Sequence, residues 1–418
     1  MNKKVIAGIM AVTMIMGGAV CPVASVMNAA VITASADVSG DYEYVVFGDK
    51  SVEITKYNGN GGKVTVPAKL NGMTVVSIGY EAFDGCHNIT SVTLPNTLKS
   101  IGENAFFYCS KLTSITIPSG VTEINSYAFE NCQSLKSITI PDTVTSMESC
   151  VFDGCEKLTS IKLSKKLKAI PEYTFSGCKS LKSVTIPKGV TSIGQHAFAQ
   201  CYALESISIP STVKTLGSNA FWDCKTLKKL SLPDGITEIQ SNTFIDCVSL
   251  ATVKFPKNLK SISLDAFRGC TKLTNVQLPE GLKEISYDAF YGCIAMGTVK
   301  IPKSVTKISN NALGFYDNGK IKGFKIVCYK NSAAEKYAKE YGLKYQTIAN
   351  STKVTKGDVN GDGNINVTDI SMTASHIKAT KALSSAQKSN ADVNSDGNID
   401  VTDISMIAAH IKGIKAIK

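Results

Sequence analysis

Two acidic stretches near the C-terminus carry the residues of this sequence that are best suited to chemistry. "DVNGDGNINVTD" spans residues 358–369 and "DVNSDGNIDVTD" spans residues 392–403. Each places Asp or Asn at positions 1, 3, 5, 7, 9 and 12 of a twelve-residue loop, with Gly363 or Gly397 at position 6. Calcium binds carboxylate, amide and backbone oxygens at this spacing, and the glycine permits a sharp turn. The pattern predicts two calcium loops, because a merely acidic turn would not reproduce it twice.

The candidate ligands fall at the same loop positions in both stretches. Position 7 would offer its backbone carbonyl and position 9 would act through a water molecule. The first loop supplies Asp358, Asn360, Asp362, Asn364, Asn366 and Asp369, and the second supplies Asp392, Asn394, Asp396, Asn398, Asp400 and Asp403.

Both loops depart from an ordinary EF-hand. Position 12 is Asp instead of Glu, and we expect no amphipathic helix before either loop, since the polar "ANSTKVTK" precedes the first. A helix is predicted after each loop, in "ISMTASHIKA" and "ISMIAAHIKG", because apolar residues recur on one helical face. These faces contain Ile370, Ala374 and Ile377 in the first helix and Ile404, Ala408 and Ile411 in the second.

Two loop–helix halves of this kind resemble the type I dockerin family, over residue 357 to about residue 415. The resemblance implies a small all-α module that binds two Ca²⁺ and docks into a cohesin domain of a scaffoldin. It assigns calcium to the twelve loop residues above, and cohesin contact to loop positions 10 and 11 with exposed residues of the following helix. Those cohesin-binding candidates are Val367, Thr368, Ala374, Ser375, Val401, Thr402, Ala408 and Ala409.

Because the two halves match closely, we expect the module to dock in two orientations related by a half turn. His376 and His410 also occupy matching positions. Calcium prefers oxygen ligands, so these histidines are expected to be surface residues.

The middle of the chain repeats every 23 residues, which is shown by ten cysteines from Cys86 to Cys293. A fixed period in the twenties is typical of a leucine-rich-repeat solenoid. In the unit "LTSITIPSGVTEINSYAFENC", residues 112–132, "SITI" alternates as a short strand does, and proline ends it. We therefore predict a mixed α/β fold, in which 23-residue rungs with short parallel strands stack into a solenoid and the small all-α module follows.

The predicted organisation has six parts. A hairpin and an expanded unit cap the N-terminal end, while "GFKIVCY" and "SAAEKYAKEYG" predict a last strand and a helix at the other end. The parts are a signal peptide (1–36), an N-terminal cap (37–84), the solenoid (85–310), a C-terminal cap (311–348), a linker (349–356) and the dockerin (357–418).

The repeat and its flanks resemble the BspA-type leucine-rich repeat family. The likeness rests on the "LxxIxIPxxVxxIxxxAFxxCxxL" unit and on "VPAKLNGMTVVSIGYEAF" and "NSAAEKYAKEYGLKY", and it covers roughly residues 41–348. It implies a surface-exposed, non-enzymatic module that binds proteins or matrix components, without one fixed ligand.

Two features of the repeat have more than one interpretation. The column of cysteines could form disulfides or could fill buried space as free thiols, which we favour because a regular ladder gives no reason for selective pairing. The outward face of the strands is rich in Ser and Thr and turns basic toward the C-terminal rungs. That face is either a soluble surface or a docking surface. Phe107 with Tyr108, Trp222 and Tyr291 lie on three separate rungs, so we predict no contiguous aromatic platform for sugars.

The N-terminus predicts secretion. Lys3 and Lys4 precede an apolar stretch, and "ASA" at residues 34–36 offers a cleavage site, with a lipid anchor on Cys21 as the alternative. No other apolar run is long enough to span a membrane. The net charge of +11 is spread over lysines, with Arg268 as the one arginine, so nucleic-acid binding is not expected.

No catalytic motif is present, since the sequence lacks G-x-S-x-G, H-E-x-x-H and a P-loop. We expect a non-catalytic, extracellular component of a cellulosome-type polysaccharide-degrading complex, with the dockerin bound to a scaffoldin at the cell surface and the solenoid presenting a binding surface. The alternatives are an accessory protein with glycoside hydrolase activity, a peptidase inhibitor or an adhesin.

Overall fold

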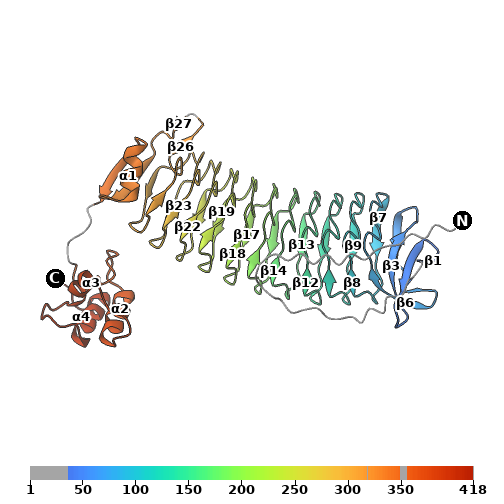
Figure 1. The fold of residues 1–418 in the computed structure, drawn as a ribbon, viewed down its shortest axis with the longest axis horizontal. Helices are drawn as coiled ribbons and strands as arrows, with labels where there is room; N and C mark the ends of the chain where they lie inside the picture. Colours follow the sequence, from blue (N-terminus) through green and yellow to red (C-terminus); the bar gives the residue numbers. More distant parts are fainter. Residues whose placement is uncertain (1–35, 318, 349–354, 418) are drawn as a thin grey trace.

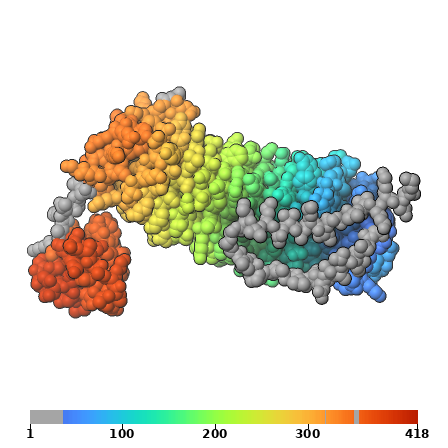
Figure 2. Space-filling model, viewed as in Figure 1, coloured from blue at the N-terminus to red at the C-terminus, as the bar shows by residue number. Residues whose placement is uncertain are grey.

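The computed structural model describes residues 36–317, 319–348 and 355–417. The predicted signal peptide up to residue 35 and residues 349–354 of the predicted linker lie outside these ranges. Residues 36–348 form an elongated solenoid and residues 355–417 form a small helical unit (Figures 1 and 2). Among the described residues, no helix has the length and apolar character that crossing a membrane requires.

An antiparallel meander begins the solenoid. It consists of β1 (Asp37–Ser39), β2 (Tyr42–Val46) and β3 (Ser51–Tyr57), and the short β5 (Lys69–Leu70) pairs with β6 (Met73–Ile78). From β3 onward the pairing becomes parallel, because each rung returns the chain to the same edge. The predicted hairpin cap is thus confirmed, and it covers the first rung.

Most rungs contribute two short strands to two parallel columns (Figure 1), and the rung at Asn275 contributes only an isolated bridge to the first column. The first column carries the predicted "SIT"-type strands, whose central residue is mostly buried between two exposed ones. It comprises β4 (Gly62–Thr65), β7 (Ile89–Thr93), β9 (Ser114–Thr116), β11 (Ser137–Thr139), β13 (Ser160–Lys162), β15 (Ser183–Thr185), β17 (Ser206–Ser208), β19 (Lys229–Ser231), β21 (Thr252–Lys254), β24 (Thr298–Lys300), β28 (Lys325–Tyr329) and β29 (Lys344–Ile348).

The second column follows the proline of each rung and was not predicted. Its strands are mostly two residues long, which is too short for an alternating pattern to be read from the sequence. It comprises β3, β6, β8 (Ser100–Ile101), β10 (Glu123–Ile124), β12 (Ser146–Met147), β14 (Ala169–Ile170), β16 (Ser192–Ile193), β18 (Thr215–Leu216), β20 (Glu238–Ile239), β22 (Ser261–Ile262), β23 (Glu284–Ile285) and β25 (Lys307–Ile308).

A ladder of phenylalanine rings runs along the solenoid core. Neighbouring rings lie 4.9–5.9 Å apart and nearly parallel, and all are fully buried. Because a single rung leaves its ring uncovered, stacking supplies the burial that holds the rungs together. The ladder consists of Phe83, Phe106, Phe129, Phe152, Phe175, Phe198, Phe221, Phe244, Phe267 and Phe290.

The cysteine column runs beside this ladder. From Cys109 to Cys293, each thiol donates to the carbonyl of the phenylalanine 26 residues earlier, at 3.1–3.2 Å. All cysteines among the described residues are free, and all but Cys86 are buried. Burial raises the pKa of Cys132 and Cys178 well above the ordinary thiol value, so these thiols remain protonated.

The third side of each rung is a run of turns in place of a helix. Two positions per rung adopt a left-handed backbone, one directly before the cysteine and one five residues before it, and the latter has φ between 52° and 61°. We call the latter residues the left-handed column. They are Glu81, Asn104, Tyr127, Cys150, Tyr173, His196, Asn219, Asn242, Asp265, Asp288 and Asn311.

The C-terminal cap contains the predicted strand β28 and helix α1 (Ala333–Glu340), together with the hairpin β26 (Phe315–Tyr316) and β27 (Gly319–Lys320). Ser332 caps α1 by accepting from the Glu335 backbone N–H, whereas the Glu335 carboxylate accepts from the N–H of Asn331. The Tyr337 hydroxyl donates to Leu313, which fixes the helix against the last rung.

The C-terminal unit contains α2 (Val367–Ile377), α3 (Ser385–Ala391) and α4 (Val401–Ile411). No amphipathic helix was expected before either loop; the short polar helix α3, in which only Ala391 is buried, leads directly into the second loop. A capping box between Ser384 and Gln387 fixes the start of α3. The helix was not predicted because its seven residues show no apolar periodicity. The core is small, and its buried apolar residues are Val359, Leu383, Ala391, Val393 and Ile407.

Candidate calcium and partner-binding site

The first acidic loop is ordered by hydrogen bonds to its own carboxylates. Asp358 accepts from the N–H groups of Asp362 (3.1 Å) and Gly363 (2.9 Å). Fully buried Asp369 reaches back from α2 and accepts from Asn360 (3.0 Å) and Asn366 (2.9 Å). Positions 1 and 12 therefore close the loop from opposite ends, while Gly363 makes the turn at φ +88°.

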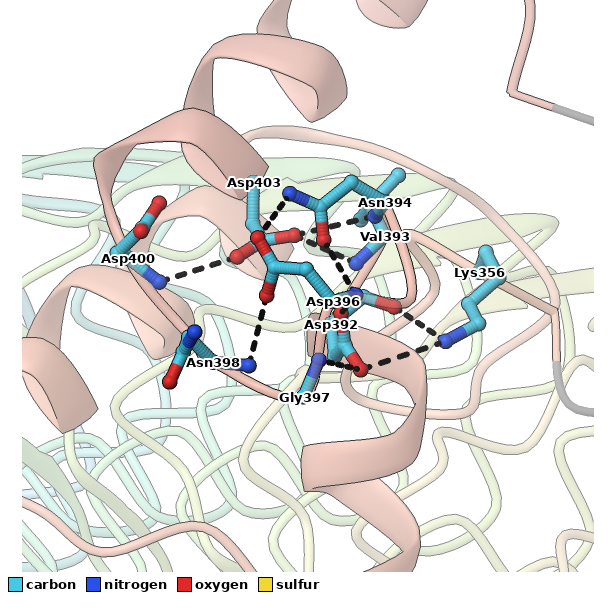
Figure 3. A network of polar contacts seen from close by, with 9 residues as sticks. All are labelled: Lys356, Asp392, Val393, Asn394, Asp396, Gly397, Asn398, Asp400 and Asp403. Carbon is cyan, nitrogen blue, oxygen red and sulfur yellow. Dashed lines mark hydrogen bonds and ion pairs between the residues drawn. The ribbon is translucent and has the colours of Figure 1, made fainter.

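The second loop repeats this arrangement (Figure 3). Asp392 accepts from the N–H groups of Asp396 (3.1 Å) and Gly397 (3.2 Å). Asp403, also fully buried, accepts from Val393 at 2.6 Å and from Asp400 at 3.0 Å. Asp403 in α4 thus closes the second loop in the same way that Asp369 in α2 closes the first.

Position 9 of each loop begins the following helix. The side chains of Asn366 and Asp400 accept from the backbone N–H groups of Thr368 (2.8 Å) and Thr402 (2.7 Å). The hydrogen bonds from Thr402 lower the pKa of Asp400, so this carboxylate is ionised at neutral pH. The loop residues that were predicted from the sequence are therefore also the caps of α2 and α4.

Two side chains outside the loops tie the halves together, and neither was predicted. Asn390 donates to the backbone carbonyl of Asp358 (2.6 Å), and Lys356 donates to the backbone carbonyl of Asp392. Lys356 and Asn390 stand 34 residues apart and each lies two residues before its own loop. The contact is therefore reciprocal: each half holds the first residue of the other half's loop.

The reciprocal pair is unequal in charge. The Lys356 ammonium lies 4.0 Å from the Asp392 carboxylate (Figure 3), whereas Asn390 is neutral. The second loop also carries one carboxylate more than the first, Asp400 in place of Asn366. Lys356 thus places a positive charge beside the loop that carries more carboxylates.

The donor set fits a hard cation. At positions 3 and 5 the side chains face each other, since Asn360 donates to Asp362 at 2.9 Å and Asn394 to Asp396 at 2.6 Å. Within the described ranges, no group of three or more His, Cys, Asp or Glu side chains could by itself hold a metal ion. A calcium loop would in addition use the Asn amides and a backbone carbonyl, so the mixed oxygen set suits Ca²⁺ and no softer metal.

The residues predicted to contact cohesin lie on matching parts of α2 and α4. Val367 and Val401 are 66% and 68% exposed, although both are apolar. Thr368 and Thr402 are exposed as well, and Ala374, Ser375, Ala408 and Ala409 are half-buried one to two turns further along. Helix α2 packs against α4, and Thr373 and Ile407 occupy equivalent buried positions.

The predicted apolar helix faces prove to be only partly buried. Ile377 and Ile411 are 37% and 38% exposed, while the most buried residues of the two helices include the carboxylates Asp369 and Asp403. Apolar periodicity alone could not predict the buried residues of these helices, because two of them are hydrogen-bonded carboxylates, Asp369 and Asp403.

The two matching histidines have a structural role in each half. The Nδ1 atom of His376 accepts from the Leu383 N–H at 3.4 Å, and that of His410 accepts from the Ile417 N–H at 3.1 Å. Each histidine thereby fixes the turn that follows its helix.

A run of three rings on the solenoid was also missed. Tyr173 stacks on His196 with ring centroids 4.6 Å apart, and His196 contacts Trp222 edge to face at 6.1 Å. Of the four aromatic residues considered from the sequence, Phe107 contacts Tyr108, and Tyr291 lies against Arg268. The run was missed because Tyr173 and His196 belong to the left-handed column and not to the position after the Ala-Phe pair.

Comparison with known families accounts for both parts of the chain. The BspA-type leucine-rich repeat region, in six copies, matches residues 76–205 and 191–322. The chain belongs to the BspA-type leucine-rich repeat family. The type I dockerin domain matches residues 356–412 of this repeat protein. No curated protein matches the chain.

Solved structures of bacterial leucine-rich repeat proteins are similar to the solenoid. A leucine-rich cell surface protein from Faecalibacterium prausnitzii A2-165 is 27% identical, with a TM-score of 0.53, and the match covers 77% of this chain and 96% of that one. A leucine-rich repeat protein from Bacteroides ovatus ATCC 8483 is 28% identical over 75% of this chain and 99% of that one, with a TM-score of 0.45.

These matches carry functional expectations of their own. Type I dockerins are generally calcium-binding, and the domain implies a cohesin partner in a cellulosome-type complex. Leucine-rich repeats suggest a binding role, and both families are typically non-catalytic. Together they suggest an extracellular or cell-surface location.

Proposed function

We propose that this repeat protein is a secreted, non-catalytic component of a cellulosome-type polysaccharide-degrading complex. Its dockerin binds two Ca²⁺, docks to a cohesin of a scaffoldin, and thereby anchors a solenoid that presents a binding surface. The observation that carries the proposal is the duplicated loop–helix unit, in which both loops show the same carboxylate-closed geometry.

The residues that would hold calcium are the twelve predicted from the sequence. Bound calcium would supply the positive charge that brings the carboxylates of positions 1, 5 and 12 together. The chain itself contributes the helix caps, the buried position-12 carboxylates and the reciprocal contacts of Lys356 and Asn390. Calcium binding is thereby coupled to the placement of α2 and α4.

The cohesin surface would be the exposed starts of α2 and α4. Val367 with Thr368 and Val401 with Thr402 form two equivalent apolar–hydroxyl pairs, and both valines are exposed and so available to a partner. Because the pairs are equivalent, either half can lead in docking.

Binding of the full-length protein to a panel of recombinant type I cohesins in calcium tests this surface. Replacing Val367 and Thr368 by Asp, or Val401 and Thr402 by Asp, should weaken binding only a few-fold. Replacing all four should abolish it. The control is Tyr287→Ser, an exposed aromatic residue on the solenoid. Complete loss from one pair alone would contradict docking in two orientations, and binding by the fourfold variant would contradict the surface itself.

A further inference from the structure

Most rungs fill the left-handed column with the residues that suit it. Asn or Asp stands at six of its eleven positions, Asn104, Asn219, Asn242, Asp265, Asp288 and Asn311. These side chains tolerate a left-handed backbone because they hydrogen-bond locally, whereas a tyrosine ring gains nothing from it. Tyr127, Tyr173 and His196 nevertheless occupy the column in the central rungs, at φ 61°, 54° and 52°.

His196 has a second unfavourable feature besides its left-handed backbone. Its Nδ1 atom is buried and has no hydrogen-bond partner among the described residues. Burial also lowers the pKa of this imidazole, so the ring is neutral at neutral pH. Backbone strain and unpaired polar atoms tend to persist where a side chain serves a function, and here they coincide in one ring.

A third ring, Trp222, contacts His196 on the next rung. Tyr173, His196 and Trp222 contact one another across three successive rungs, at centroid distances of 4.6 Å and 6.1 Å. All three are half-buried, so part of each ring remains accessible. We call these three rings the aromatic border; in the chain they follow β14, β16 and β18 of the second strand column.

A shallow groove of about 370 Å³ crosses the same rungs, and two of its lining residues adjoin rings of the border in the chain. Glu172 and Gln195, which line it, immediately precede Tyr173 and His196 in the chain. Gly194 and Gly217 form part of its floor, so backbone is accessible there. The other polar side chains that line it are Ser192, Thr215, Ser218 and Gln240.

The chemistry of the groove selects among ligands. None of the described residues that line it is a lysine or arginine, so it is poorly suited to phosphates or acidic sugars. Its amides and hydroxyls pair with hydroxyl groups, while the ring edges beside it offer apolar contact. Neutral pyranose chains present both kinds of group.

We propose that the groove and the aromatic border of Tyr173, His196 and Trp222 together bind a short segment of an uncharged polysaccharide. This site names a ligand for the solenoid and so rests on the proposed function, in which the dockerin delivers that solenoid to a polysaccharide-degrading complex. The solenoid, which the dockerin attaches to the complex, would then also hold the complex against the polysaccharide.

Affinity electrophoresis of the full-length protein tests the site, with hydroxyethyl cellulose, arabinoxylan or mixed-linkage glucan in the gel and polygalacturonate as the charged comparison. The decisive variants are Tyr173→Asn and His196→Asn, which install the residue that other rungs use at these positions. We expect at least one neutral polymer to retard the wild type, and each variant to weaken that binding about tenfold or more. Both variants should keep or raise the melting temperature of the solenoid, because Asn suits the backbone.

Controls separate the possible outcomes. Tyr287→Ser, at an exposed ring outside the border, should bind as the wild type does. If either Asn variant lowers the melting temperature, polysaccharide binding is measured with Gln195→Ala and Gln240→Ala instead. Full binding by both of these variants would overturn the proposal. It would also be overturned if no neutral polymer retards the wild type or if only polygalacturonate does. Cohesin binding, measured on the same preparations, reports separately on the proposed function.

Discussion

The solenoid and the C-terminal module solve the same stability problem in different ways. The solenoid buries one phenylalanine, one leucine and one thiol per rung in a continuous core. The module buries only five apolar residues, together with the carboxylates of Asp358, Asp369 and Asp403. The comparison teaches that the solenoid can be stable through packing alone, whereas the module places negative charges at the centre of a small core and depends on what neutralises them.

Removal of one ring from the ladder should have the largest effect. Phe198→Ala takes away a fully buried side chain that stacks on Phe175 and Phe221 at 5.3 Å. We expect the free energy of unfolding of the solenoid to fall by about 3–5 kcal/mol. Urea denaturation followed by the fluorescence of Trp222 measures it. Unchanged cohesin binding by the folded variant would sharpen the contrast, and a loss below 1 kcal/mol would contradict a core held by stacking.

Asp403→Ala tests the module in the same way. It removes a buried carboxylate that accepts from Val393, Asn394 and Asp400, so three backbone donors lose their partner. The expected cost is about 2–4 kcal/mol in the stability of the module. The helical signal of α2–α4 in calcium should melt earlier while the solenoid transition stays in place. Equal loss in both transitions would mean that the two parts do not fold independently.

Lys356→Asn sharpens the comparison between the halves of the module. It gives the first half the residue that the second half has at position 390, and it removes the cation 4.0 Å from Asp392. We expect calcium affinity of the second loop to rise about 3–10-fold, with a smaller effect at high salt. Calorimetric titration of the full-length protein measures it, and Asn390→Lys should weaken the first loop instead. Identical isotherms for all three proteins would show that Lys356 only positions the Asp392 carbonyl.

The smallest effect should come from the surface of the turns. Burial and the neighbouring Asp153 raise the pKa of Glu130 to about 7. A carboxyl with a raised folded-state pKa loses stability as pH increases from about 4.5 through 7, because the unfolded chain releases its proton first. After allowance for screening at this half-exposed site, Glu130→Gln should stabilise the solenoid by about 1 kcal/mol above pH 7 and by nothing below pH 4. A difference that does not change with pH would refute this assignment.

Sequence patterns predicted those parts of the structure that depend on a repeat or on residues close together in the chain. The step of 23 residues predicted the solenoid, and ligand spacing located both acidic loops, because each depends on residues a fixed distance apart. The second strand column was not predictable, since two-residue strands acquire order only from their neighbours in the stack. The reciprocal contacts of Lys356 and Asn390 and the ring border of Tyr173, His196 and Trp222 join residues from different units. Such contacts exist only after the chain has folded.

Chelation tests the central claim most directly. The far-ultraviolet circular dichroism of the full-length protein and its binding to a cohesin should be measured before and after calcium is removed with excess EDTA. We expect α2–α4 to lose their helical signal and cohesin binding to fall by at least a hundredfold, while the melting transition of the solenoid does not move. Added calcium should restore both the helical signal and the binding. Helical content and cohesin affinity that persist without calcium would contradict it.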